Sequence, residues 1–145
     1  MVKILIKKLD PAVKLPLYKT PSASGMDLMA FLKKPITLKS KSSCLVSTGI
    51  SIAFPEDYEI QVRPISGLAL KKNITVLNTP GTIDSDYRGE VKVIMYNHGG
   101  EDFIINNGDR IAQIVLAPVM KIELVETKSL PKTLRGKGGF GSTGK

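Results

Sequence analysis

Short runs of alternating apolar and polar side chains, separated by glycine and proline, dominate this sequence of 145 residues. Residues 58–63 alternate throughout, and residues 50–54 keep their bulky side chains on one face. Residues 91–96 and 114–117 are more continuously apolar, as in strands that are more deeply buried. Many short strands with turn signals between them are typical of a β-sandwich or barrel. The sequence therefore predicts an all-β fold.

One segment has the properties of a short helix. Residues 66–72 begin with Ser66, a residue type that favours the N-cap position, and continue with good helix formers. The chain length is that of one domain, which we expect to cover residues 1–134.

Residues 135–145 differ from the rest in composition, because five of these eleven residues are glycine. Such a segment cannot offset its ordering entropy by packing, so it is typical of a flexible tail. A lone aromatic ring, Phe140, nevertheless lies between glycines, with Arg135, Ser142 and Thr143 nearby. The same composition suits an arm that closes over a ligand, with the ring stacked on it and the amides and hydroxyls around an anion. Both interpretations are open at this point.

Composition and charge exclude several functional classes. The chain has no run of about 18 apolar residues, and its apolar N-terminal stretch is too short for a signal peptide. The single cysteine, Cys44, cannot form an internal disulfide, so we expect an intracellular, cytoplasmic protein. A net charge of +8 suggests an anionic partner, but the lysines are dispersed and no nucleic-acid-binding motif is present. We expect no nucleic acid and no membrane as partner.

The segment at residues 78–89 contains an amide, two carboxylates, a phenol and a guanidinium around a Pro-Gly turn. These groups belong to Asn78, Asp84, Asp86, Tyr87 and Arg88. We expect a hairpin whose backbone and amide groups read a planar base by its hydrogen-bonding edge. Asp84 could then act as a general base on water. The alternative is a polar turn in which the aspartates bond only to their own backbone.

Two further segments have phosphate-binding character. Ser66-Gly67 lies at the expected helix start, where free amides favour an anion, although most such starts are only caps. Residues 108–113 form a turn leading into a strand, which taken alone is also compatible with a surface ion pair. The sequence has no His/Cys cluster for a transition metal, so an enzyme built from it would use carboxylates and a hard cation that arrives with the substrate.

Taken together and in order, five segments resemble the five sequence motifs of the trimeric dUTPase family. The segments are residues 23–30, 64–69, 78–89, 108–113 and 135–144. The resemblance extends from about residue 15 to the end of the chain, and five motifs in order are far more specific than any one of them.

The resemblance implies a jelly-roll-like β fold with one short helix, assembled as a homotrimer whose active sites lie between subunits. It implies an enzyme that hydrolyses dUTP to dUMP and pyrophosphate, which limits uracil incorporation into DNA and supplies dUMP for dTMP synthesis. Residues 135–145 would be the arm that closes over a neighbouring subunit's site. Asp84 would be the catalytic base, and Asp27 would help to place hydrated Mg²⁺ through water.

By the same resemblance, the substrate-binding residues surround the base, the sugar and the phosphates of dUTP. They are Ile65, Ser66, Gly67, Asn78, Thr82, Ile83, Asp84, Tyr87, Lys92, Gln113, Arg135, Phe140, Gly141, Ser142 and Thr143. The sequence departs from the family at one of them, because the second motif usually reads Pro-Arg-Ser-Gly and here has Ile65 in place of the arginine. Arg63, Lys71 or Lys72 could compensate for that lost charge.

Two alternatives to an active dUTPase remain. Members of the dCTP deaminase group resemble dUTPases in fold but need a glutamate near the base, and residues 78–89 have Asp84 and no glutamate. A catalytically weak dUTPase-like protein that binds partners is the other alternative, and only Ile65 favours it.

Overall fold

Most of the alternating runs form strands in the computed structural model, which describes residues 1–141. Within these residues there are eleven strands and one helix. In chain order they are β1 (Leu5–Lys8), β2 (Met26–Met29), β3 (Ile36–Leu38), β4 (Ser43–Ser47), β5 (Ile50–Ala53), β6 (Tyr58–Arg63), α1 (Ser66–Lys72), β7 (Ile74–Val76), β8 (Gly81–Ile83), β9 (Lys92–Asn97), β10 (Phe103–Ile105) and β11 (Arg110–Pro118). The all-β prediction is confirmed.

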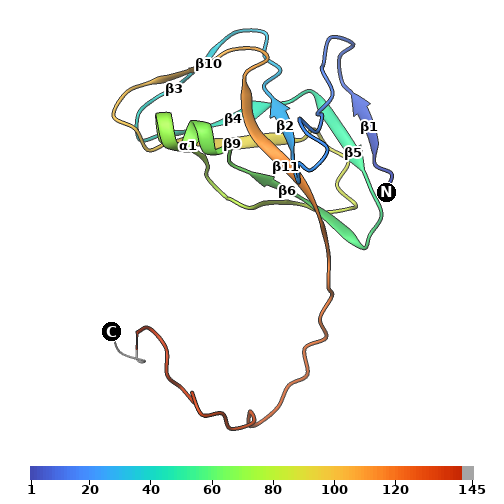
Figure 1. Cartoon of the computed structure of the whole chain (residues 1–145), viewed down its shortest axis with the longest axis vertical. Coiled ribbons are helices and arrows are strands. Elements are labelled where there is room, and N and C mark those ends of the chain that lie inside the picture. Colours follow the sequence, from blue (N-terminus) through green and yellow to red (C-terminus); the bar gives the residue numbers. More distant parts are fainter. Residues whose placement is uncertain (142–145) are drawn as a thin grey trace.

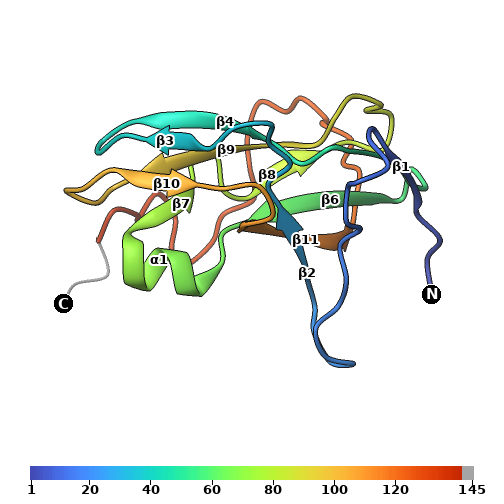
Figure 2. The ribbon, with the colours of Figure 1, turned by 90° about the horizontal axis from the view of Figure 1, so that it is seen from above.

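Two antiparallel sheets form the body of the molecule. The larger sheet has the order β2-β11-β6-β8, and the smaller has the order β4-β9-β7. Strands β1 and β5 form one additional pair, and β3 and β10 form another. In Figure 2 the ribbons of β4 and β9 lie above those of β6 and β11, so the two sheets form two layers.

The core lies between these layers, because each strand turns alternate side chains inward. Val46, Val93 and Met95 come from the smaller sheet, and Ile60 and Ile114 from the larger. Each buried aliphatic side chain of this size stabilises the fold by about 1.5–3 kcal/mol. Strand β9 is buried on one face only, since Lys92 and Ile94 are exposed, so the prediction of a deeply buried strand at residues 91–96 was wrong.

The predicted helix is present with the predicted bounds, but its N-cap differs. Ile65 occupies the N-cap with an extended backbone, and no side chain caps the helix. Ser66 is therefore already inside the first turn, because the extended chain after Pro64 enters the helix one residue earlier than expected. Asn73 ends the helix in the left-handed conformation, donating its backbone N–H to the preceding turn.

The predicted hairpin at residues 78–89 is wrong. Strand β7 before the turn pairs with β9, whereas β8 after it pairs with β6. The turn at residues 77–80 therefore carries the chain from one sheet to the other. Alternation identifies strands, but the packing of the two layers decides which strands pair.

The C-terminal part of the chain leaves this body. The backbone N–H of Val119 still donates to the carbonyl of Asp57 (2.8 Å), and residues 119–141 then run away from the sheets as an extended segment (Figure 1). Within residues 1–141 no helix is long and apolar enough to cross a membrane.

Candidate active site

Strand β11 brings three of the five motifs together. Gln113 in its middle lies opposite Asp27 of β2 on one side and opposite Arg63 of β6 on the other. The side-chain amide of Gln113 donates to the carbonyl of Pro64 (2.9 Å), just before the Ser66-Gly67 turn. The predicted residues Asp27, Ser66 and Gln113 are thus held in one region by neighbouring strands.

Close packing at Gly25 fixes the first motif against the fourth. A Cβ atom at this position would lie 2.6 Å from Gln113 Oε1 and 3.2 Å from the carbonyl of Ile114. Only glycine leaves room for this approach of β2 to β11.

Asp27 is the carboxylate of this region. Its Oδ2 atom lies 3.3 Å from Nη1 of Arg110, and its side chain is 13% exposed against 61% for Arg110. Because one partner is well exposed, the pair contributes about 1 kcal/mol or less to stability. Its main effect is to hold the carboxylate in place.

A cleft of about 620 Å³ lies beside these strands. It is lined by Ile65, Ser66 and Gly67 from the second motif, together with Lys71 of the helix and Arg110 of β11. Small-molecule sites typically have a volume of about 300–1,000 Å³. We call it the phosphate cleft, because Ser66 and Gly67, two residues predicted to contact phosphate, line it.

A second hollow, of about 330 Å³, contains the other predicted group. Five predicted residues line it together: Thr82, Ile83, Asp84, Tyr87 and Lys92. We call it the base hollow. Asp84 is exposed at the end of β8, where the strand leaves the sheet.

Local hydrogen bonds fold residues 84–90 into a compact turn. The backbone N–H of Tyr87 donates to the carbonyl of Asp84 (3.1 Å), and the Tyr87 hydroxyl donates to the carbonyl of Glu90 (3.0 Å). The Tyr87 ring lies against Gly89 so closely that a Cβ there would overlap its hydroxyl and ring atoms. The contact of Asp84 in this turn is made by its backbone carbonyl rather than by its carboxylate, and the turn also holds a phenol beside Asp84.

Glu90, which the sequence did not identify, anchors this turn to the body. Its Oε1 atom accepts the backbone N–H of Gly49 (2.9 Å), and its Oε2 atom lies 3.5 Å from Nζ of Lys92. No residue pattern distinguishes Glu90 from a surface carboxylate, since its partner Gly49 is far away in the sequence.

Asn78 lies at the start of the same segment, over the first residue of β8. A Cβ at Gly81 would come within 3.2 Å of Asn78 Nδ2 and 3.4 Å of Val62 Cβ. The asparagine amide therefore lies close to the β8 backbone, although Asn78 does not line the base hollow itself.

The phosphate cleft and the base hollow share no lining residue. Asp27 is on β2 and Thr82 on β8, at opposite edges of a four-stranded sheet. Three strand spacings put these edges about 14 Å apart. A single chain thus carries two separate parts of the predicted site.

The third predicted part, the arm, lies with neither of them. Arg135 donates through Nε to the carbonyl of Gly138 (2.9 Å), and Phe140 is fully exposed. Gly141 has a φ of 86°, which favours glycine. The predicted residues Ser142 and Thr143 lie outside the described residues.

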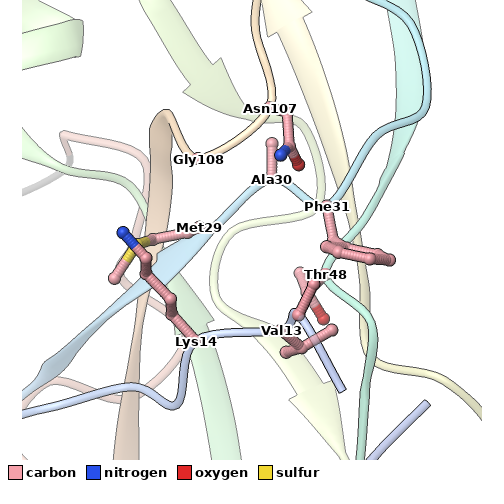
Figure 3. Close-up of a pocket in the computed structure, with 9 residues that line it drawn as sticks. Val13, Lys14, Met29, Ala30, Phe31, Thr48, Asn107 and Gly108 are labelled. Carbon is pink, nitrogen blue, oxygen red and sulfur yellow. The ribbon is translucent and has the colours of Figure 1, made fainter. Parts of the chain in front are cut away.

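A smaller cavity of about 140 Å³ lies at the opposite end of β2 (Figure 3). Figure 3 shows Lys14 and Met29 on one side and Phe31 and Thr48 on the other. Two of its polar side chains already form hydrogen bonds, because Asn107 Oδ1 accepts the backbone N–H of Leu32 (2.9 Å) and Thr48 donates to the carbonyl of Val91. This cavity is not part of the predicted site.

The match to a known family agrees with this geometry. The family model described as dUTPase matches residues 12–144.

The chain belongs to the dUTPase family.

Relatives of similar length support the assignment to this dUTPase family. The chain is 54% identical to the deoxyuridine 5'-triphosphate nucleotidohydrolase of Hydrogenobaculum sp. (strain Y04AAS1), over 99% of both chains. It is 53% identical to the protein of the same name from Fusobacterium nucleatum, over 100% of both chains. The family predicted from the five motifs, and with it the function of dUTP hydrolysis, is confirmed.

Solved structures of dUTPases have the same fold. A dUTPase of phage 80alpha aligns with a TM-score of 0.86 at 21% identity, covering 97% of this chain and 98% of that one. Another structure of the Staphylococcus bacteriophage 80alpha dUTPase, with dUpNHpp, aligns with a TM-score of 0.83 at 20% identity, over 99% of both chains. The jelly-roll-like fold predicted from the resemblance is confirmed.

Proposed function

We propose that this dUTPase hydrolyses dUTP to dUMP and pyrophosphate with Asp84 as the general base. The observation that carries the proposal is the base hollow, where Asp84 lies with Thr82, Ile83 and Tyr87. An exposed carboxylate beside a nucleoside-sized space can take a proton from water.

The chemical step is an in-line displacement. Asp84 accepts a proton from a water molecule, whose oxygen forms a bond to the α-phosphorus of dUTP. The bond from this phosphorus to the bridging oxygen breaks, and the electron pair leaves with pyrophosphate. The products are dUMP and pyrophosphate, with the proton left on Asp84 before it passes to solvent.

Mg²⁺ is the cation we propose to enter with the triphosphate. When bound, it would neutralise phosphate charge in the leaving group. Asp27 offers one hard oxygen donor, because only its Oδ2 atom is paired among the described residues. Mg²⁺ keeps several waters and needs only one or two carboxylates, so an outer-shell role of Asp27 through water fits this donor set. For a related phage phi11 dUTPase, coordination of a structural Mg(II) ion has been described.

Specificity in this proposal comes from backbone rather than from flexible side chains. Strand β8 carries Thr82 and Ile83, and its pairing with β6 makes it a stiff wall against a 5-methyl group. Asn78 reads the edge of uracil, while Tyr87 packs against the deoxyribose and disfavours a 2′-hydroxyl. Lys92 lines the same hollow.

A homotrimer would unite the separated parts of the site. The exposed apolar side chains of Met120, Ile122 and Leu124 alternate with charged ones in the segment that leaves the body. Such a row buries its apolar face only against another surface. We propose that this surface is a neighbouring subunit, and that residues 135–145 reach on to its active site, with Arg135, Gly141, Ser142 and Thr143 on the phosphates and Phe140 stacked on uracil.

The substrate indicates the cellular role of the enzyme. Removal of dUTP limits uracil incorporation into DNA, and dUMP supplies dTMP synthesis. We propose that this takes place in the cytoplasm. The free Cys44 fits a reducing compartment, and burial raises the pKa of its thiol, which keeps it protonated and poorly reactive.

A comparison of nucleotides tests the proposal. Pyrophosphate release with Mg²⁺ should be fast for dUTP and slower by orders of magnitude for dTTP, dCTP and UTP. Comparable rates for dUTP and dTTP would contradict the proposed steric wall. Release of ammonia from dCTP would instead support the deaminase alternative.

A further inference from the structure

The phosphate cleft is lined by an apolar side chain, Ile65, at the position where the resemblance to the dUTPase motifs implies an arginine. We propose that Lys71 supplies the positive charge that binds the triphosphate of the substrate in this cleft, in place of the arginine that Ile65 replaces. This inference rests on the proposed function, because it assigns a further binding residue to the same site.

Arg63 is not placed for this role. Both its Nε and Nη2 atoms donate to Oε1 of Gln61, at 2.9 and 2.6 Å, along the outer face of β6. Arg63 does not line the phosphate cleft, and its guanidinium fork is already occupied.

Two other cations lie nearby, Arg110 and Lys72. Arg110 lines the cleft, but its Nη1 atom is paired with Asp27 at 3.3 Å. Lys72 lines an adjoining hollow with Asn73 and residues 99–102 but not the phosphate cleft, whereas Lys71 lines both.

Lys71 and Arg110 are the two cations of the cleft wall, and Lys71 is the one that forms no ion pair among the described residues. It lies four residues after Gly67, so the two share one face of α1, and both line the cleft with Ser66. Among residues 1–141 no salt bridge engages its ammonium group. Its long flexible stem lets this group move to a ligand that occupies the cleft.

Three carboxylates lie near Lys71, and none of them forms a salt bridge with it among the described residues. Asp109 lines the cleft, but its Oδ2 atom accepts the backbone N–H of Asn106 (2.8 Å). Glu101 and Asp102 line the adjoining hollow, where Asp102 accepts the backbone N–H of Ser40 (2.9 Å). A triphosphate carries more negative charge than any of these groups and can draw Lys71 into the cleft.

The test compares two neighbouring lysines in the full-length chain. Lys71→Met removes the charge and keeps the length of the side chain, and Lys72→Met makes the same change outside the cleft. We expect Lys71→Met to raise both the KM for dUTP and the Kd for inorganic pyrophosphate about tenfold, the low end for a charge-assisted contact. Lys72→Met should change either constant less than twofold, and both variants should melt at the parental temperature.

A second variant separates charge from packing. Ile65→Arg should restore the KM of Lys71→Met toward the parental value and should improve it less when Lys71 is present, since either cation then neutralises the same phosphates. A Lys71→Met protein with parental KM and pyrophosphate Kd would overturn the inference, as would equal effects of the two lysine variants. If the parental chain does not hydrolyse dUTP, the proposed function fails, and pyrophosphate binding by calorimetry still decides the role of Lys71.

Discussion

Asp84 lies where β8 leaves the larger sheet, and the base hollow surrounds it with groups suited to a nucleoside. The turn that follows holds Tyr87 beside it by two hydrogen bonds within residues 84–90. The carboxylate is exposed, so it is accessible to water before the substrate binds.

Replacement of this carboxylate should separate binding from chemistry. Asp84→Asn keeps the size and polarity of the side chain but cannot accept a proton from water. We expect kcat to fall by about 10²–10⁴-fold, the usual contribution of a general base. Binding of a non-hydrolysable dUTP analogue, measured by calorimetry, should stay within a few-fold of the parental value. Near-parental turnover would show that another group is the base.

The position of Tyr87, which we propose to pack against the deoxyribose, depends on the glycine at position 89. Gly89→Ala places a Cβ against the Tyr87 ring, so the ring must move away. We expect weaker discrimination between dUTP and UTP, measured as the ratio of their kcat/KM values. Gly100→Ala is the matched control, because a Cβ there meets nothing within 4 Å. An unchanged ratio in Gly89→Ala would mean that Tyr87 does not select the sugar.

Among the elements, the ones with a strict local pattern were predictable. Strand β6 and helix α1 begin and end where the sequence indicated, since alternation and helix formers act within a few residues. Strand pairing was not predictable in the same way. The partners β6 and β8 lie on either side of α1 and β7, and only the packing of the two layers joins them.

In the candidate site, too, some residues could be predicted from the sequence and others could not. The five motifs predicted Asp27, Asp84 and Gln113 as site residues, and the structure places Asp27 and Gln113 on paired strands and Asp84 in the base hollow. Glu90 gave no signal in the sequence, and Lys71 could be named only as one of several candidate cations, since their contacts depend on which side of a turn or helix they face. Lys71 was only one of three candidate cations until its position relative to the cleft was known.

A further prediction concerns the C-terminal arm, residues 135–145. Deletion of residues 135–145 removes no buried side chain among those described, so the melting temperature should change little. Turnover of dUTP should fall by at least about tenfold, because Arg135 and the ring of Phe140 are lost from the ligand. Phe140→Ala alone should give a smaller loss of the same kind. A truncated protein with full activity would refute a closing arm.

At the scale of the whole molecule, the proposed neighbouring subunit would bury the exposed side chains of Met120, Ile122 and Leu124. We expect light scattering to report a homotrimer at micromolar concentration without ligand. The double variant Ile122→Ser and Leu124→Ser should weaken it, because burial of each side chain contributes about 1.5–3 kcal/mol. Lys121→Ser with Glu123→Ser changes the intervening positions and should leave the trimer intact. A monomeric parental protein would contradict the assembly.

Residues 119–141 run away from the sheets of their own chain (Figure 1), so the proposed arm and the Asp84 that it serves belong to different subunits. A defect in one subunit therefore need not disable every active site. The Asp84→Asn variant still has an intact arm, and the variant without residues 135–145 still has Asp84. When the two inactive variants are unfolded together and refolded as a mixture, some active sites should combine Asp84 from one subunit with the arm from another. Activity that is recovered in the mixture, compared with each variant refolded alone, would show complementation between subunits of one assembly. Failure to recover any activity would mean that each chain serves only itself.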